Sequence, residues 1–184
     1  MKKCLVLVFL AVSLSFVSKP DALGSTTSIR PERIQLIKEI QGRLNLSFQC
    51  DFSVSIGETR KYATGNSGGI IIIDKSFLES ADRERIFFAI AHEYAHAYLQ
   101  HDVLVYEHLE DSDSRSLVEI RRRCEKEADG IAARKAKQMG FPIESIREFI
   151  LAQSDPEKGV PPEYRVYSKP RERAEYILTV YQSS

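Results

Sequence analysis

The sequence of 184 residues predicts one α+β domain, in which helices pack against a small, mainly antiparallel sheet. Apolar residues recur at helical spacing in three segments: residues 31–46, 86–101 and 116–139. Three short stretches between the first two of these segments have the alternation or the β-branched composition of strands: residues 48–56, 60–64 and 70–73. Short strands that follow one another along the chain favour antiparallel pairing.

The helices have recognisable start and stop signals. Pro31 suits the first turn of the first helix, and the apolar residues of that helix are spaced to cover a core: Ile34, Ile37, Ile40 and Leu44. Ser80 is the expected N-cap of the second helix. The third helix opens with the capping-box pattern S-x-x-E at residues 116–119 and ends before Gly140.

The strand segments differ in their expected burial. Residues 48–56 alternate, which is typical of a half-buried strand, with one side formed by Phe48, Cys50, Phe52, Val54 and Ile56. Residues 70–73 are four isoleucines, which is typical of a strand buried on both faces or nearly so. We expect an exposed edge of this sheet to be able to bind an extended peptide by strand addition.

The first 24 residues have the pattern of a secretory signal peptide. A pair of lysines precedes a mostly apolar run over residues 4–17, and the small residues Ala22 and Gly24 suit cleavage before Ser25. The run is short for a spanning helix, which needs about 20 residues. We therefore expect an exported protein, periplasmic or secreted, with one domain over residues 25–184 and no stable membrane span after cleavage.

Charge and cysteine content limit the function classes. The chain has 26 basic and 26 acidic side chains, so it does not resemble a general nucleic-acid binder. Residues 121–123 are arginines, which is typical of a solvated helix face. Cys50 and Cys124 remain after signal cleavage. In an exported protein such a pair predicts a disulfide, and the alternative is two buried free thiols.

The segment 86–101, IFFAIAHEYAHAYLQH, contains the pattern H-E-x-x-H at residues 92–96. On an α-helix His92 and His96 lie on nearly the same face, so both imidazoles can reach one metal ion. Glu93 lies beside them, where it can accept a proton from a water molecule that the metal activates. This arrangement is typical of zinc metalloproteases, and the alternative is a surface helix that carries two histidines by chance.

A catalytic zinc ion takes three protein ligands and leaves one position open for water. We expect Glu125 as the third ligand, because its face of the helix borders an apolar stripe: Leu117, Ile120, Cys124, Ala128 and Ile131. Asp129, one turn further on, can accept a hydrogen bond from a metal-bound histidine, whereas Glu127 is expected to point the opposite way. His101 is expected to be a structural or supporting residue, and His108 to be exposed. The alternative for Glu125 and Asp129 is a solvated acidic patch that pairs with nearby basic residues.

Several pieces of the chain occur in an order that resembles a known family: residues 62–63, 69–74, 92–96 with His101, 125–129 and 139–141. They resemble the gluzincin peptidases related to HtpX and the CAAX prenyl protease, over about residues 60–180. The resemblance implies a zincin-like α+β fold whose sheet lines the cleft. It also implies zinc held by His92, His96 and Glu125, with Glu93 as the catalytic base. Soluble exported members are small endopeptidases, often linked to envelope protein quality control.

One segment departs from the family pattern. Members usually carry a histidine–proline pair near the C-terminus, followed by an arginine, whereas this chain has Lys169-Pro170 with Arg173 after it. The histidine is expected to steady the reacting oxyanion. Lys169 can do so as a cation, and Tyr164 or Tyr167 can donate a hydrogen bond instead. The plainer interpretation of these three side chains is surface or packing.

The sequence therefore predicts a zinc-dependent endopeptidase whose partner is a protein or peptide substrate. The alternative from another class is a zinc-stabilised binding or chaperone-like module with little peptidase activity. A third interpretation is a protease that cleaves one dedicated partner.

Overall fold

The computed structural model describes residues 29–109 and 113–184, so the expected signal peptide lies outside the described residues. The described part combines helices with one small sheet and is α+β, as predicted. Its helices and strands follow one another in this order: α1 (Pro31–Phe48), β1 (Ser53–Gly57), β2 (Ala63–Gly65), β3 (Ile70–Asp74), α2 (Lys75–Ser80), α3 (Arg83–Tyr98), α4 (His101–Glu107), α5 (Ser114–Gln138), α6 (Ile143–Leu151), a 3-10 turn (Pro162–Tyr164) and α7 (Pro170–Ser183).

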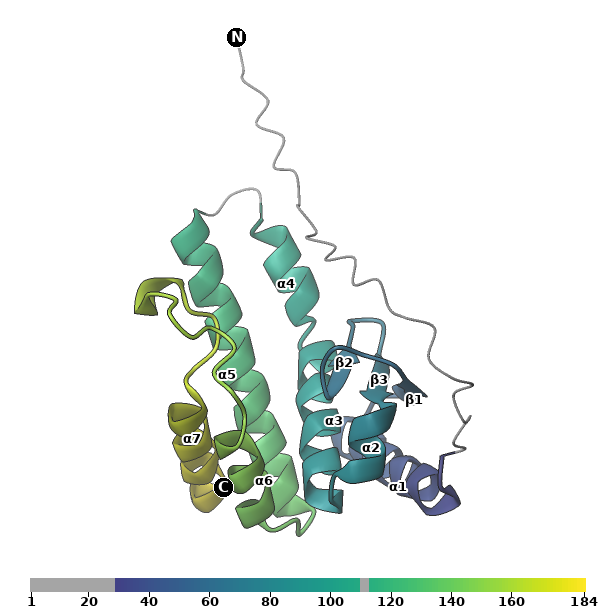
Figure 1. The fold of residues 1–184 in the computed structure, drawn as a ribbon. Helices are drawn as coiled ribbons and strands as arrows, with labels where there is room; N and C mark the ends of the chain where they lie inside the picture. The colour runs from purple at the N-terminus through teal and green to yellow at the C-terminus, as the bar shows by residue number, and fades with distance from the viewer. Residues whose placement is uncertain (1–28, 110–112) are drawn as a thin grey trace, which may run out of the picture.

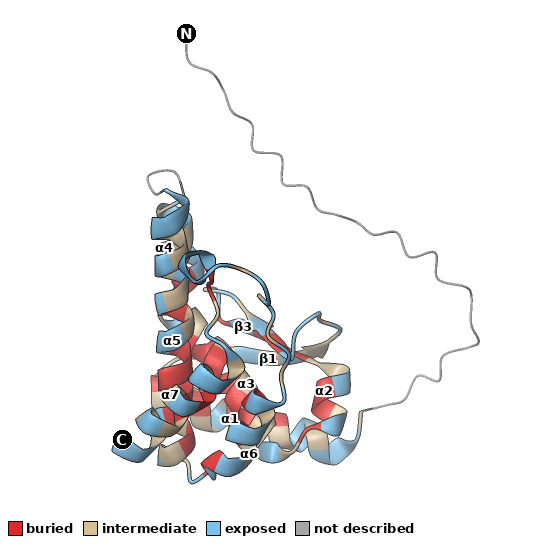
Figure 2. Ribbon diagram, turned by 60° about the vertical axis from the view of Figure 1, so that its left-hand side comes forward, coloured by how far each residue is buried: buried red, intermediate tan, exposed pale blue. Residues whose placement is uncertain are grey.

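Helix α3 lies in the middle of the molecule. The sheet, α1 and α2 lie on one side of it, and α5, α6 and α7 lie on the other (Figure 1). Buried residues are concentrated on α3 and on the parts of α5 and α7 that face inward (Figure 2). A central helix buried on several sides can hold polar side chains only where partners are supplied, which makes the polar residues of α3 informative.

The sheet is mixed, which corrects the prediction of a mainly antiparallel sheet. Strand β3 is central, with β1 parallel to it and β2 antiparallel to it. The strand predicted over residues 48–56 begins only at Ser53, because α1 continues to Phe48 and Gln49 ends it in the left-handed conformation, with φ 54°. Because β3 is the central strand, β2 lies at an edge of the sheet. The loop of residues 66–69 joins β2 to β3.

Strand β3 is buried on one face rather than on both. Ile71 and Ile73 are fully buried, whereas Ile70 is 49% exposed. The reason is that alternate side chains of a strand point to opposite faces, and only one face of this small sheet packs on the core.

Two helix signals differ from the predictions. The N-cap of α3 is Asp82, whose carboxylate accepts a hydrogen bond from the backbone N–H of Arg85 at 2.9 Å, because Ser80 ends the short helix α2. The sequence predicts no separate helix between the segments 86–101 and 116–139, whereas α4 begins at His101, and the N-cap of α5 is Asp113. Gly140 follows α5 with φ 75°, as expected for a glycine beyond a helix end.

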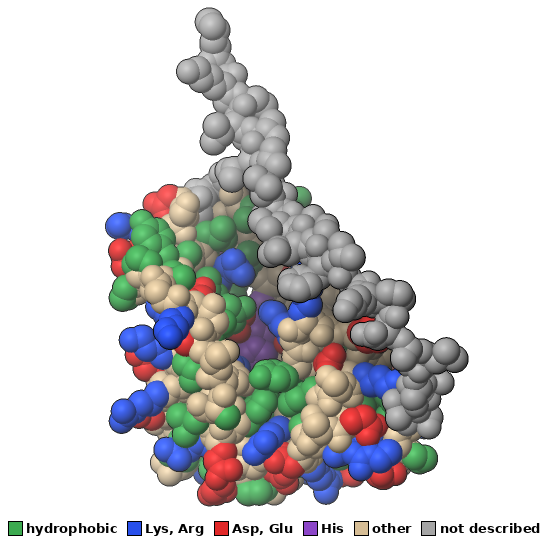
Figure 3. Space-filling view, viewed as in Figure 1, with side chains coloured by type: hydrophobic (Ala, Val, Ile, Leu, Met, Phe, Trp, Pro, Cys, Tyr) green, Lys and Arg blue, Asp and Glu red, His purple; other side chains and the backbone are tan. Residues whose placement is uncertain are grey.

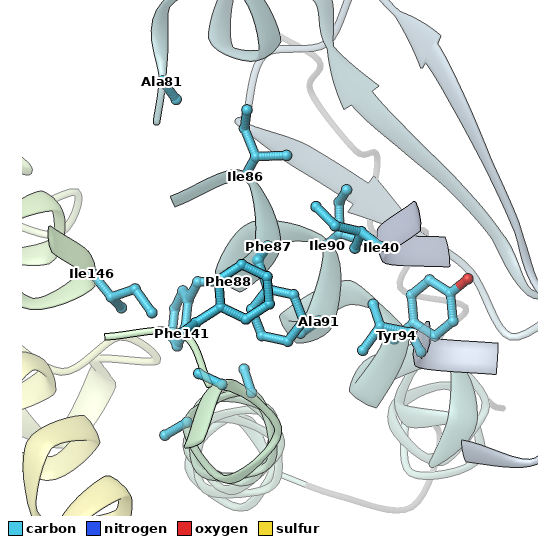
Figure 4. Close-up of a cluster of buried hydrophobic side chains, with 14 of the residues drawn as sticks. Ile40, Ala81, Ile86, Phe87, Phe88, Ile90, Ala91, Tyr94, Phe141 and Ile146 are labelled. Carbon is cyan, nitrogen blue, oxygen red and sulfur yellow. The ribbon is translucent and has the colours of Figure 1, made fainter. Parts of the chain in front are cut away.

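The core is built from the apolar residues of α3 and the elements on both sides of it (Figure 4). Phe87 of α3 stacks on Phe141 with ring centroids 4.2 Å apart. Tyr94 is fully buried, and its hydroxyl donates a hydrogen bond to Asn45 Oδ1 at 3.0 Å. Tyr98, the last residue of α3, is half exposed. Each fully buried large apolar side chain stabilises the fold by roughly 1.5–3 kcal/mol, so α3 is held rigidly.

None of the helices within residues 29–109 and 113–184 has the length and apolar character needed to cross a membrane.

Candidate metal centre

Helices α3 and α5 bring His92, His96 and Glu125 together. The two helices approach closely because small buried alanines lie where they pack: Ala91, Ala95, Ala128 and Ala132. The Nε2 atoms of His92 and His96 are 3.1 Å apart. The Oε2 atom of Glu125 lies 3.4 Å from Nε2 of His92 and 3.7 Å from Nε2 of His96. Two histidines one helical turn apart and a carboxylate from a second helix thus point at one spot.

The spacing of these three donor atoms suits a small tetrahedral cation. A tetrahedral ion about 2.1 Å from each ligand separates two ligands by about 3.4 Å. The observed separations of 3.1, 3.4 and 3.7 Å bracket that value. Two imidazoles and one carboxylate are a set that zinc accepts with a position left for water. The residues present therefore fit such an ion.

His92 is oriented from behind by Asp129 and Arg173. Nδ1 of His92 lies 2.9 Å from Oδ1 of Asp129, so its N–H donates to that carboxylate. Arg173 of α7 donates two hydrogen bonds of 2.7 Å to the two oxygens of Asp129, which is buried. Because this contact keeps a proton on Nδ1, Nε2, the atom that faces Glu125, is the nitrogen of His92 that can bind a cation. The contact predicted between Asp129 and a site histidine is present.

His96 is oriented by His101 of α4. The two Nδ1 atoms are 3.0 Å apart, so one must donate to the other. If Nε2 of His96 is left free for a cation, its proton lies on Nδ1 and is donated to Nδ1 of His101. His101 then carries its own proton on Nε2, which lies 3.5 Å from Oε2 of Glu127. Glu127 thus faces His101, although it is separate from the three donor atoms. His101 is buried, which supports its predicted role as a supporting residue.

The charges at this site stabilise one another in the metal-free protein. Burial opposes the charge on His92, but the hydrogen bonds to Asp129 and Glu125 outweigh burial and raise the pKa of His92 to about 9. Burial also opposes the charges of Glu125 and Asp129, yet His92 and His96 lower the pKa of Glu125, and Arg173 and His92 lower that of Asp129. A cation between the three donors would replace the proton on Nε2 of His92.

Glu93 lies between the three donors and strand β2. A Cβ atom added to Gly65 would be 3.4 Å from Oε2 of Glu93 and 3.3 Å from its Cβ atom, so strand β2 and helix α3 approach closely at this glycine. Within residues 29–109 and 113–184 no protein group forms a hydrogen bond or ion pair with the Glu93 carboxylate. The Glu93 carboxylate is therefore partly exposed beside His92, His96 and Glu125, and it has no protein partner in the described part of the chain.

Two cavities meet at these residues. One of about 260 Å³ and one of about 870 Å³ are both lined by Lys61, His92, Glu93 and Glu125. In the space-filling view, histidine is visible at the bottom of a hollow with hydrophobic side chains beside it (Figure 3). The donor cluster is therefore reachable from solvent through an open cleft.

The C-terminal candidates are placed differently. Tyr167 lines the larger cavity with Arg173. Lys169 is exposed at the N-cap of α7 and Tyr164 lies in the 3-10 turn, and neither lines either cavity. Lys169 therefore shows the plainer of its two predicted roles, a surface residue. The backbone N–H of Lys169 and the Glu172 carboxylate form a 3.3 Å hydrogen bond that caps the helix.

The predicted disulfide between Cys50 and Cys124 is not formed, since both thiols are free. Sγ of Cys50, which follows α1, donates to Oδ1 of Asn45 in that helix, at 3.5 Å. Cys124 lines the smaller cavity from α5. The two thiols belong to different surroundings, and the alternative of two buried free thiols holds in part, because Cys124 is buried and Cys50 is only partly buried.

Sequence reasoning did not assign a role to Arg173 or to the aromatic wall of the larger cavity. Arg173 is 44 residues from Asp129 along the chain. It lies in a segment with several charged residues, so the local pattern does not set it apart from the other arginines. Its place after the Lys169-Pro170 pair was the one signal that marked it.

Comparisons of the chain with protein-family models, with curated proteins and with solved structures give no match. The chemistry of these residues is therefore the guide to function.

Proposed function

We propose that this protein is a zinc-dependent endopeptidase that hydrolyses peptide bonds. The observation that carries the proposal is the convergence of two imidazole nitrogens and one carboxylate oxygen, with Glu93 beside them in an open cleft. His92, His96 and Glu125 would hold the ion. A zinc ion in such a site activates water and polarises a carbonyl.

The residues of the chain have separate roles in this mechanism. Glu93 takes a proton from the attacking water and later gives it to the leaving amine. Asp129 and His101 keep His92 and His96 in the required tautomers. Tyr167 is the donor that the larger cavity offers for an oxyanion in place of Lys169.

The edge of β2 supports a mode of substrate binding. Its residues Ala63, Thr64 and Gly65 line the two cavities, and Gly65 lies against Glu93. An extended peptide paired with this edge would lie across the donor cluster. Strand addition at β2 therefore brings a peptide bond to the reacting groups.

The sequence resemblance supports a more specific version of the proposal. In that version the chain is a gluzincin peptidase with a zincin-like fold, exported to the periplasm or the medium by its first 24 residues, and acts on envelope or exported proteins. The order of the pieces at residues 62–63, 92–96 and 125–129 supports this version, as does the sheet that lines the cleft.

Cleavage of an unfolded protein such as casein tests the proposal. We expect zinc-loaded protein to cut it, a chelator to stop cleavage, and Glu93→Gln to bind zinc but lose at least 100-fold in rate, roughly the contribution of a general base. Glu84→Gln, in the first turn of the same helix, is the matched control and should retain activity. Equal cleavage by Glu93→Gln would refute the mechanism. If zinc binds and neither casein nor an exported protein is cut, a zinc-stabilised binding module replaces the peptidase.

A further inference from the structure

We infer that the smaller cavity binds a carboxylate group of the substrate, and that Lys61 and Arg121 are the side chains that bind it. The inference rests on the proposed peptidase function, because it names a substrate preference of the same cleft.

Lys61 and Arg121 reach this cavity from two separate segments. Lys61 lies before β2, and Arg121 lies in α5. Both line the cavity together with His92, Glu93 and Glu125. Arg121 and Glu125 are four residues apart in one helix, so they share a face of it. In the space-filling view, Lys and Arg side chains border the hollow in which histidine is visible (Figure 3). Two basic groups therefore lie beside the position that the reacting bond would occupy.

Neither basic side chain has a partner in the described part of the protein. Lys61 and Arg121 are exposed, and within residues 29–109 and 113–184 neither side chain forms an ion pair or a hydrogen bond with a protein group. Arg122, the next residue of α5, differs, because it donates hydrogen bonds of 2.6 to 2.9 Å to the backbone carbonyls of Pro162 and Arg165. The ammonium and guanidinium groups at this cavity are thus available to an anion that enters from solvent.

The acidic groups of the cavity have other contacts. Asp102 accepts hydrogen bonds from the backbone N–H groups of Ser67 at 3.1 Å and Val103 at 2.9 Å. Glu125 faces the two histidines, and Glu93 lies against β2. With a divalent ion at the donor atoms, the ion and the two basic side chains supply four positive charges against three carboxylates. The cavity then favours an anion over a cation.

The size and polarity of the cavity suit one small polar group. Its volume is about 260 Å³, below the roughly 300–1,000 Å³ that is usual for drug-sized ligands. Thr64, Asn66 and His101 add polar lining. An apolar side chain would remove water from these groups without giving them partners, whereas a carboxylate can accept hydrogen bonds. A peptide supplies a carboxylate from an aspartate or glutamate side chain or from its C-terminus.

Peptide binding tests the inference without requiring turnover. Labelled, amidated peptides that differ only in one aspartate or asparagine are titrated with zinc-loaded Glu93→Gln, and binding is measured by fluorescence anisotropy. We expect the aspartate peptide to bind roughly 5- to 10-fold more tightly at low salt, since two exposed ion pairs each contribute up to about 5-fold. High salt should reduce this preference. A neutral peptide with a free C-terminus, compared with its amidated form, shows whether a terminal carboxylate is bound instead.

Three further variants, made in the Glu93→Gln protein, identify the side chains responsible. Lys61→Gln and Arg121→Gln should each lower the preference for the carboxylate several-fold. Arg123→Gln replaces an exposed arginine of the same helix that lines neither cavity, and this matched control should keep the preference. All three side chains are exposed, so we expect the variants to fold.

The outcomes separate this inference from the proposed function. A preference for either carboxylate that Lys61→Gln and Arg121→Gln reduce supports the site. Equal binding of charged and neutral peptides overturns it, as does a preference that both variants retain, because the carboxylate would then bind elsewhere, for example at the metal ion itself. Cleavage of the same peptides by the wild-type protein tests the peptidase separately. Cleavage without a carboxylate preference overturns the inference alone, and preferential binding without cleavage of any peptide contradicts the peptidase alone.

Discussion

His101 and Asp129 act on the two histidines in the same way, although one is an imidazole and the other a carboxylate. Each faces the ring nitrogen that does not point at Glu125. A partner at Nδ1 fixes which nitrogen keeps its lone pair, and such partners typically contribute 10- to 100-fold to metal affinity. The pair His96–His101 needs no charge for this effect, because an unprotonated Nδ1 is an acceptor.

This arrangement predicts that His101→Ala weakens zinc binding by roughly 10- to 100-fold. Competition with a chelator of known affinity measures the effect. His108→Ala is the matched control, because His108 bonds only to the Leu104 carbonyl within the part of the chain that the structure describes. Equal zinc affinity of the two variants would show that His101 only fills space.

The raised pKa of His92 predicts how the stability of the metal-free protein depends on pH. Folding raises this pKa from 6.5 to about 9, so the charged ring stabilises the fold fully below pH 6.5. The contribution, on the order of 3 kcal/mol, is lost as the pH rises to about 9. Urea unfolding across this range should show the decline. Zinc-loaded protein should lack it, since the ion replaces the proton on Nε2, and equal declines in both forms would contradict this assignment.

At the scale of single elements, the loop between β2 and β3 depends on one glycine. Gly69 has φ 74°, and a Cβ atom there would lie 2.2 Å from the ring of Phe52. Gly140 has φ 75°, and a Cβ atom added there would have no atom within 4 Å. A substitution at Gly140 therefore measures the cost of the backbone conformation alone.

We expect Gly140→Ala to lower the free energy of unfolding by about 1 kcal/mol, the cost of the left-handed conformation. Gly69→Ala should cost roughly 1–3 kcal/mol more, because the ring of Phe52 must move. Urea unfolding of both variants measures the difference. Equal losses would mean that the Phe52 ring moves aside freely.

The long helices could be predicted from sequence because their signal is local. Helices α1, α3 and α5 have apolar residues at a period that any window of the chain shows. The start of β1 could not, because the alternation of residues 48–56 continues across the end of α1 without a break in composition. The parallel pairing of β1 with β3 is also a tertiary property, since no turn residue between them encodes it.

At the scale of the whole molecule, the residues of the candidate metal centre could be predicted from sequence where a single helix determines their positions. His92 and His96 follow from one helical turn, and Glu125 follows from a helix face plus the need for a third ligand. Arg173 and the larger cavity depend on the packing of α6 and α7 against the rest of the molecule, which no periodicity specifies. The missing disulfide has the same origin, because a cysteine count carries no distances.

The account as a whole requires that α3 and α5 jointly hold one metal ion. The most direct measurement is the zinc content of purified wild-type protein beside Glu125→Ala, determined by mass spectrometry after dialysis against trace zinc. We expect one zinc ion per chain in the wild type, and in Glu119→Ala, an exposed glutamate of the same helix. Glu125→Ala should retain far less than one. Full zinc occupancy in Glu125→Ala, or none in the wild type, would contradict the proposed metal centre.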